Sequence, residues 1–388
     1  EADGDLDIVL SSATAGGVSV LQNNANGTFT PLKTPFVGVA SPLRAFAWAD
    51  FDSDGDPDAA FVDASGNLMY FTNERSGRFE RRQTPVLPGK AVALVAGVID
   101  NSSQFSLLIL LEDGSIVALT DKNNGTEWDG PKPLGKSGTA KPARLFLADM
   151  DNNGAVDLIV AGADTTDILL SDGPGKFAEK PVTAPISAQS IADLNADGLL
   201  DLAGIAGGKP VCALASASQN YKWQTVTLQA ADHPREDSRI NPFSIGGEVE
   251  IRSGLLYQKQ PIITPQLHFG LGTYDHVDAA RIIWPNGNPQ GEFDLKIGNV
   301  VAQQRLGGSC PFLYTWDGQK MVFVTDCIWR SPLGLKINAQ VTAGVTQTED
   351  WVKIRGDQLV AQDGIYKLSI TAELRETHFF DKVGLMAV

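Results

Sequence analysis

The apolar positions of this chain come in short runs separated by polar turns. Leu43–Ala49 and Ala59–Val62 are apolar and partly alternating, and Phe105–Leu111 is apolar at every position except Ser106. Further along, Glu248–Arg252 alternates between polar and apolar side chains, as a half-buried strand does. The chain also has 39 Gly and 21 Pro residues, which favour turns over long helices. The pattern therefore predicts an all-β chain of short strands.

A nine-residue polar pattern recurs between such strands. Each copy has Asp or Asn at positions 1, 3, 5 and 9 and Gly at position 6. Two carboxylates about 4 Å apart repel by roughly 1 kcal/mol in water and roughly 4 kcal/mol at an effective dielectric near 20, so such a loop needs a cation. Oxygen ligands at this spacing are typical of Ca²⁺. The predicted ligands are Asp50, Asp52, Asp54, Asp56 and Asp58; Asp149, Asp151, Asn153 and Asp157; and Asp193, Asn195, Asp197 and Asp201.

An EF-hand has similar spacing in its first half but differs at the end. It requires a bidentate Glu at position 12 and helices on both sides. Here position 12 is Phe61, Val160 or Gly204, and the flanking runs are strand-like. The sequence therefore predicts calcium loops between β-strands.

The spacing of the loops predicts a repeated fold. A degenerate copy begins at Asp100, with Leu108 at position 9, and no metal is expected there. A truncated copy opens the chain and adds Asp3 and Asp7 as candidate ligands. The period is about 45 to 50 residues, the length of one propeller blade. A turn and an aromatic residue follow each loop, which supports the same period; these aromatic residues are Phe29, Phe79, Trp128, Phe177 and Trp223.

Residues 1–230 resemble the FG-GAP/VCBS repeats of integrin-type β-propellers, in which such a loop leads into each blade and holds calcium. The resemblance implies about five visible blades of a ring that commonly has seven. Because the chain begins inside a calcium loop, we expect this part to be N-terminally truncated.

Two further segments follow. Residues 231–305 resemble the ASPIC/UnbV domain, on the motifs Asn241–Arg252, Leu267–Gly272 and Ile282–Gly287. That domain follows FG-GAP repeats in cartilage acidic protein-like and bacterial secreted proteins. Residues 306–388 alternate again and predict a small β-sandwich-like domain, with a hairpin turn at Asp317-Gly318.

Cysteine and charge bear on the compartment. A disulfide between Cys310 and Cys327, at the outer ends of the Asp317 hairpin, is geometrically plausible and would need an oxidising compartment. Cys212 is most simply a buried core thiol. The net charge of −15 argues against nucleic acid as a partner, and no apolar run is long enough for a membrane helix. We expect an extracellular or periplasmic protein.

The sequence offers no catalytic constellation, so we expect no enzyme. The four His residues lack metal-ligand spacing, and His268 reads as a packed or turn-bonded residue. The first functional hypothesis is a binding or adhesion module for a protein or glycan partner at the cell surface, with calcium stiffening its loops. The alternative is a non-catalytic subunit or ancillary domain of a larger secreted enzyme or surface assembly, paired with further blades or other subunits. Exposure of Trp284, Trp316, Trp329 and Trp351 as a flat platform would favour sugar binding.

Overall fold

The structure is a computed structural model, and every regular element that it describes is a β-strand, so the expected all-β class is confirmed. The chain divides into two compact units, Glu1–Gln304 and Arg305–Val388. The described residues are 6–11, 17–24, 27–39, 42–74, 77–100, 102–123, 125–216, 219–230, 240–285, 289–304, 312–326, 354, 356, 358–371, 380 and 382–385.

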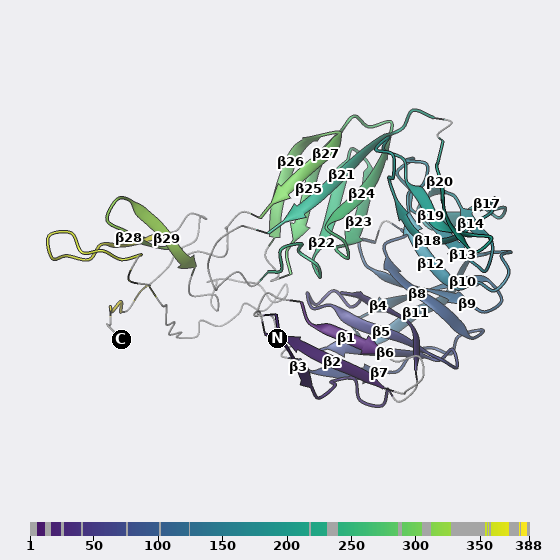
Figure 1. The fold of residues 1–388 in the computed structure, drawn as a ribbon, viewed down its shortest axis with the longest axis horizontal. Coiled ribbons are helices and arrows are strands. Elements are labelled where there is room, and N and C mark those ends of the chain that lie inside the picture. The colour runs from purple at the N-terminus through teal and green to yellow at the C-terminus, as the bar shows by residue number, and fades with distance from the viewer. Residues whose placement is uncertain are drawn as a thin grey trace. The chain divides into compact units, whose positions relative to one another are not determined.

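Five antiparallel sheets follow one another along the first unit (Figure 1). We call them blades A to E. Blade A has β1 (Ile8–Ser11), β2 (Val18–Asn23) and β3 (Phe29–Leu32), and blade B has β4 (Leu43–Ala49), β5 (Asp58–Asp63), β6 (Leu68–Asn73) and β7 (Phe79–Arg82). Blade C has β8 (Ala91–Gly97), β9 (Ser106–Leu111), β10 (Ser115–Lys122) and β11 (Glu127–Lys136). Blade D has β12 (Arg144–Ala148), β13 (Asp157–Ala161), β14 (Thr166–Leu169) and β17 (Val182–Ala184), with a hairpin of β15 (Ser171–Gly173) and β16 (Lys176–Phe177). Blade E has β18 (Ser187–Ala192), β19 (Asp201–Ala206) and β20 (Lys209–Ala213).

The second strands of blades B, C and D are buried on both faces because each packs against two neighbouring blades. In β5, Ala60 and Val62 join a core cluster with blade C, whereas Ala59 and Phe61 join one with blade A. Strands β9 and β13 divide their side chains between two clusters in the same way. This explains why Leu107–Leu111 is apolar at every position and does not alternate. Blades stacked face to face in chain order make the first unit propeller-like.

The aromatic residues that mark the period open or enter the outer strands of the blades. Phe29 and Phe79 are the first residues of β3 and β7, and Trp128 lies at the start of β11. Five blades therefore match the five repeats read from the sequence. The size of the complete ring stays a prediction.

Blade E is followed by a two-sheet sandwich. One sheet has the order β24-β21-β27, from β21 (Lys222–Gln229), β24 (Gln266–Gly272) and β27 (Gly298–Gln303). The other has the order β23-β22-β25-β26, from β22 (Glu248–Ser253), β23 (Leu256–Pro261), β25 (His276–Ile283) and β26 (Pro289–Lys296). The two sheets share a core that includes Val226, Ile251, Phe269 and Trp284. The half-buried strand expected at Glu248–Arg252 is confirmed as β22.

Strand β21 lies before residue 231, where we placed the start of the ASPIC/UnbV-like segment, yet it belongs to the sandwich. It pairs in parallel with β27 and antiparallel with β24. Its Trp223 is the fifth aromatic marker of the repeat. The sandwich is thus tied to the last repeat by a strand that the repeat itself supplies.

The second unit contains one three-stranded sheet among its described residues, in the order β29-β28-β30. Its strands are β28 (Phe312–Trp316), β29 (Met321–Asp326) and β30 (Leu368–Thr371). The hairpin expected at Asp317-Gly318 is confirmed, because Trp316 pairs with Met321 and Gly318 has a φ of 100°. Cys310 and Cys327 both lie outside the described residues, so their disulfide stays a prediction.

The interpretation of Cys212 as a buried core thiol is wrong. Cys212 is exposed and free. It lies in β20, which is the edge strand of blade E and pairs only with β19 in that sheet. An edge strand has one unpaired side and fewer neighbours, so an apolar-looking segment such as Pro210–Leu214 remains in contact with water.

Candidate metal centres

Each of the three complete acidic loops joins the first strand of a blade to the second. The loops connect β4 to β5, β12 to β13 and β18 to β19. In every case the residue before position 1 pairs with the Asp at position 9, as Ala49 does with Asp58. Ala148 with Asp157 and Ala192 with Asp201 are the equivalent pairs. The strands therefore close each loop at the same register.

The backbone of the three loops follows one hydrogen-bonding scheme. The carboxylate at position 1 accepts the amides of positions 5 and 6, at 3.1 and 3.0 Å for Asp50. The same bonds measure 3.1 and 2.7 Å at Asp149 and 3.2 and 2.9 Å at Asp193. Position 6 is Gly with a φ of 94°, 95° or 86°, a region that other residues adopt at a cost. These bonds hold positions 1 to 6 in the same turn in all three loops.

The Asp at position 9 fixes the end of the loop. Asp58 accepts the amides of Phe51 and Asn73 at 3.2 and 2.9 Å, and the Tyr70 hydroxyl donates to it at 2.6 Å. Asp157 and Asp201 accept the equivalent amides from position 2 and from a residue 14 positions further along the chain, Ser171 and Ala215 respectively. These hydrogen bonds therefore hold the position-9 carboxylate in place without a bound ion.

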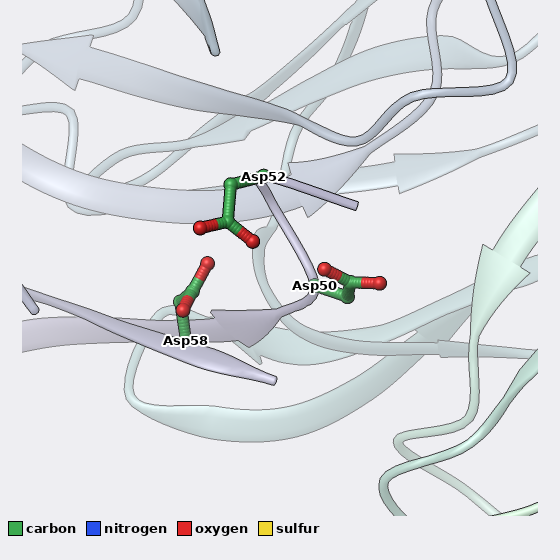
Figure 2. A group of neighbouring side chains, drawn as sticks. All are labelled: Asp50, Asp52 and Asp58. Atoms are coloured by element: carbon green, nitrogen blue, oxygen red, sulfur yellow. The ribbon is translucent and has the colours of Figure 1, made fainter. Parts of the chain in front are cut away.

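Asp50, Asp52 and Asp58 form the first acidic triad (Figure 2). Each offers one carboxylate oxygen, and these oxygens lie within 4.8 Å of one another. In Figure 2 the carboxylates of Asp52 and Asp58 face each other, with Asp50 beside them. Asp52 Oδ1 is buried and has no hydrogen-bond partner among the described residues. A buried carboxylate oxygen without a donor is costly unless a cation binds it.

The electrostatics of the first triad agree with its geometry. Burial, followed by repulsion from Asp54 and Asp50, raises the pKa of Asp52 to about 6. Burial raises the pKa of Asp58 to about 7, against the lowering effect of its hydrogen bonds. The pKa of Asp50 is also raised, mainly by burial. Three carboxylates that resist ionisation together can hold a metal ion, which supplies the missing positive charge.

Asp149, Asp151 and Asp157 form the second triad, and one carboxylate oxygen of each lies within 4.8 Å of the others. It is more enclosed than the first, since Asp149 is 3% exposed and Asp157 is 0% exposed. Burial raises the pKa of Asp149 well above its ordinary value, and burial raises that of Asp157 to about 7. This triad can hold a metal ion as well.

The third loop has the same backbone but no triad of carboxylates, although all nine of its residues are described. Position 3 is Asn195, an amide, so positions 1, 3 and 9 contain only two carboxylates. Asn195 Nδ2 donates to Asp197 at 2.9 Å, and Asp197 is exposed. Binding of an ion by Asp193, Asn195, Asp197 and Asp201 stays a prediction.

The remaining predicted ligands at positions 5 and 7 lie outside the two triads. Asp54 is exposed and accepts the amide of Asp56 at 2.9 Å. Asn153, its counterpart in the second loop, accepts the amide of Ala155 and donates to the Ser171 carbonyl. Asn153 is half-buried, and the ligand roles of both residues stay predictions.

Blade A retains the end of a similar loop. Asp7 accepts the amide of Asn23 at 2.9 Å, as Asp58 accepts that of Asn73. Asn23 Nδ2 donates to the carbonyl of Leu6, as Asn73 Nδ2 does to that of Pro57. Asp7 therefore occupies position 9 of the first repeat. Asp3 lies outside the described residues.

The register that we expected for the degenerate copy is wrong by two residues. Gly97 pairs with Ser106, which makes Ser106, not Leu108, position 9. Position 1 is then Val98, and Asp100 falls at position 3. In place of a cation-binding carboxylate, the side chain of Gln104 donates to the carbonyls of Phe51 and Asp121 at 3.1 and 3.2 Å. A protein donor thus links this loop to blade B.

Sequence reasoning missed the role of Asn152, at position 4 of the second loop. It is 1% exposed and contacts both the third loop and the sandwich. No local signal marks it, because its partners lie far along the chain. His268, one of these partners, is packed as expected: it stacks on Trp223, and burial lowers its pKa to about 4.

Stacked blades whose first two strands enclose acidic loops define a propeller-type repeat protein with candidate metal loops. Residues 2–61 and 149–204 match the family model of the FG-GAP-like repeat, and residues 238–305 match that of ASPIC and UnbV. The chain therefore carries FG-GAP-like repeats followed by an ASPIC/UnbV domain, as its motifs indicated. Such repeats are typical of extracellular proteins, and this combination indicates an extracellular binding or ancillary module.

Other comparisons add little. No curated protein matches the chain at a significant level. Among solved structures it is similar to the crystal structure of BBS1N in complex with ARL6DN, soaked with mercury, at 12% identity and a TM-score of 0.32 over 74% of this chain and 86% of that one. A similarity this low supports no conclusion. Within the described residues, no helix has the length and apolar character needed to cross a membrane.

Proposed function

We propose that this chain is an extracellular, non-catalytic binding module whose blades are stiffened by calcium and which binds a protein or glycan partner at the cell surface. The observation that carries the proposal is the pair of acidic triads, each with three carboxylate oxygens within 4.8 Å. The unpartnered Oδ1 of Asp52 supports a cation at the first of them.

The donor set favours calcium among common ions. All the ligands are hard oxygens from carboxylates and amides, without the Cys or His that zinc prefers. The first loop also contains the exposed carboxylate of Asp54 and the half-buried carboxylate of Asp56, and additional oxygens of this kind suit the larger and more flexible shell of calcium. A bound ion would remove the repulsion within each triad.

Calcium at these loops would act on the blades. Position 1 follows the first strand directly and position 9 begins the second, so an ion held by both fixes the turn between them. The same Asp58 that would hold the ion also accepts the Tyr70 hydroxyl, and Tyr70 is fully buried between blades B and C. The ion would therefore stabilise the packing between blades as well as the loop.

Two of the four tryptophans that could form a flat sugar-binding surface lie among the described residues. Trp284 is 2% exposed and donates to Gln290, so it does not contribute to a flat sugar-binding surface. Trp316 is half-buried beneath the ammonium group of Lys367. Trp329 and Trp351 lie outside the described residues. The two described tryptophans therefore do not support a flat sugar-binding platform, and the proposal keeps both a protein and a glycan as the partner.

Titration of the metal-free chain with calcium chloride in a calorimeter tests the proposal. We expect at least two ions per chain. The double variant Asp52→Asn with Asp151→Asn should lose two of them, whereas the control Asp100→Asn, at position 3 of the degenerate loop, should lose none. Absence of calcium binding by the wild-type chain would refute the proposal.

A further inference from the structure

The sandwich lies directly against the second and third acidic loops. Trp223, at the start of β21, packs so closely on Gly198 that a side chain there would overlap its indole ring. Gly270 in β24 similarly leaves no room for a Cβ against the Asp149 carboxylate and the backbone of Asn152. The amide of Gly272 donates to the Asn152 carbonyl at 2.8 Å. The sheet β24-β21-β27 thus forms one wall of the second metal loop.

Asn152 joins the three parts. Its Nδ2 donates to the carbonyl of Gly198 in the third loop at 2.8 Å. Its Oδ1 lies 2.7 Å from Nε2 of His268 in the sandwich. His268 in turn stacks on Trp223 with 5.9 Å between ring centroids. One side chain therefore connects two acidic loops with a domain that begins more than 60 residues further along the chain.

Position 4 of the other loops shows that this arrangement is specific to the second loop. Ser53, Asn152 and Ala196 have nearly the same φ, at 63°, 60° and 62°. Ser53 and Ala196 are exposed, whereas Asn152 is 1% exposed. The loop backbone therefore does not require Asn at this position, and Ala is accepted with the same geometry. What Asn152 adds is its contacts outside the loop.

We propose that Asn152 couples occupancy of the Asp149 loop to docking of the sandwich, so that an ion leaves this loop slowly and only when the sandwich moves away, while the Asp50 loop exchanges its ion freely. The inference rests on the proposed function, since it concerns the exchange of the proposed ions. Coupling is reciprocal: whatever orders the Asp149 loop also holds the sandwich in place, and loosening the sandwich loosens the loop.

The burial of the two triads supports the difference in exchange. Asp149, Asn152, Gly154 and Asp157 are all buried, and Leu256 of β23 packs on Gly154. In the Asp50 loop, residues 53–55 are exposed. Release from the second loop therefore requires a local opening that breaks the contacts of Asn152, whereas release from the first does not.

Calcium release from the full chain tests the proposal. The loaded protein is mixed rapidly with an excess of a fluorescent calcium chelator, and we expect a fast and a slow phase. Asn152→Ala and His268→Ala should each accelerate the slow phase, about tenfold for Asn152→Ala, which loses two buried hydrogen bonds. The matched control is Ser53→Ala, at the same position of the first loop and not a predicted ligand, which should leave both phases unchanged.

Hydrogen exchange gives a second readout that does not depend on release. In the wild-type chain, calcium should slow amide exchange in β24 (Gln266–Gly272) relative to chelator, and Asn152→Ala should abolish this difference while blade B keeps its protection. A slow phase that both variants leave unchanged, or exchange in β24 that ignores calcium, would overturn the coupling. If wild-type chain binds no calcium at equilibrium, the proposed function itself fails; if ions bind but leave in a single phase, only this inference fails.

Discussion

Replacing Asp52 with Asn should change stability in opposite directions with and without calcium. Asp52 is an acidic residue whose Oδ1 is buried without a hydrogen-bond partner among the described residues. In the metal-free chain its charge is repelled by Asp54 and Asp50. Asn has nearly the same shape and no charge, so the repulsion disappears while the loop keeps its volume.

The magnitude follows from the pKa of Asp52. It is raised from 3.8 to about 6, and one unit corresponds to about 1.4 kcal/mol, so ionisation at pH 8 costs at most about 3 kcal/mol. Because the side chain is only half-buried, solvent screens part of this cost, and we expect Asp52→Asn to stabilise the metal-free chain by about 1 to 2 kcal/mol. With calcium present, the variant should lose most of the ion's contribution at this loop, which is about 2.7 kcal/mol at a free concentration one hundred times Kd.

Urea unfolding at pH 8, in excess chelator and again in millimolar calcium, measures both effects. The control is Asp100→Asn, since Asp100 is exposed at the equivalent position of the degenerate loop. We expect the control to change neither curve. A variant Asp52→Asn that is less stable than wild type in chelator, or that keeps the full calcium-dependent gain, would refute the reasoning.

Three further predictions concern pH, a buried ion pair and a thiol. Burial raises the pKa values of Asp58 and Asp157 to about 7. Between about pH 4 and 7 these groups therefore keep protons in the folded metal-free chain that they have lost in the unfolded chain, so the stability of the metal-free chain should fall as pH rises through this window. The calcium-dependent gain in Tm should accordingly grow from about pH 6 to 8. Arg82→Ala leaves the buried carboxylate of Asp121 without its ion pair and should cost about 3 kcal/mol or more in chemical unfolding, while Arg81→Ala, which removes an exposed side chain, should cost less than about 0.5 kcal/mol. Cys212 is exposed, so a thiol reagent should label it in the folded chain, as peptide mapping would detect, without lowering Tm; protection of Cys212 until unfolding would contradict its position at the edge of blade E.

The acidic loops could be predicted from sequence because their geometry is local. Asp50 makes its hydrogen bonds to Asp54 and Gly55 within one nine-residue segment. Position 6 needs a positive φ, and the Gly that supplies it recurs at that position in each complete copy of the motif. The strands were predictable because burial leaves a visible pattern of apolar residues in the sequence. Their apolar runs reflect burial between blades, as the two-sided packing of β5 illustrates.

What sequence did not reveal depends on pairing between distant segments. The register of the degenerate loop follows from the pairing of Gly97 with Ser106, and counting from Asp100 placed it wrongly. The exposure of Cys212 depends on β20 being an edge strand, and this position in the sheet cannot be read from the residues of β20 alone. Asn152 contacts His268 across 116 positions of sequence, so its role required the fold.

The central claim is that the triads at Asp50 and Asp149 bind calcium and that the ions stabilise the blades. It is tested most directly by measuring Tm of the full chain in millimolar calcium and in excess chelator, with the bound metal counted on the same sample. The account predicts a large calcium-dependent rise in Tm with at least two ions per chain, because ligands that bind only the folded state stabilise it. An unchanged Tm with no bound metal would contradict it and would leave the aspartates as turn-forming residues alone.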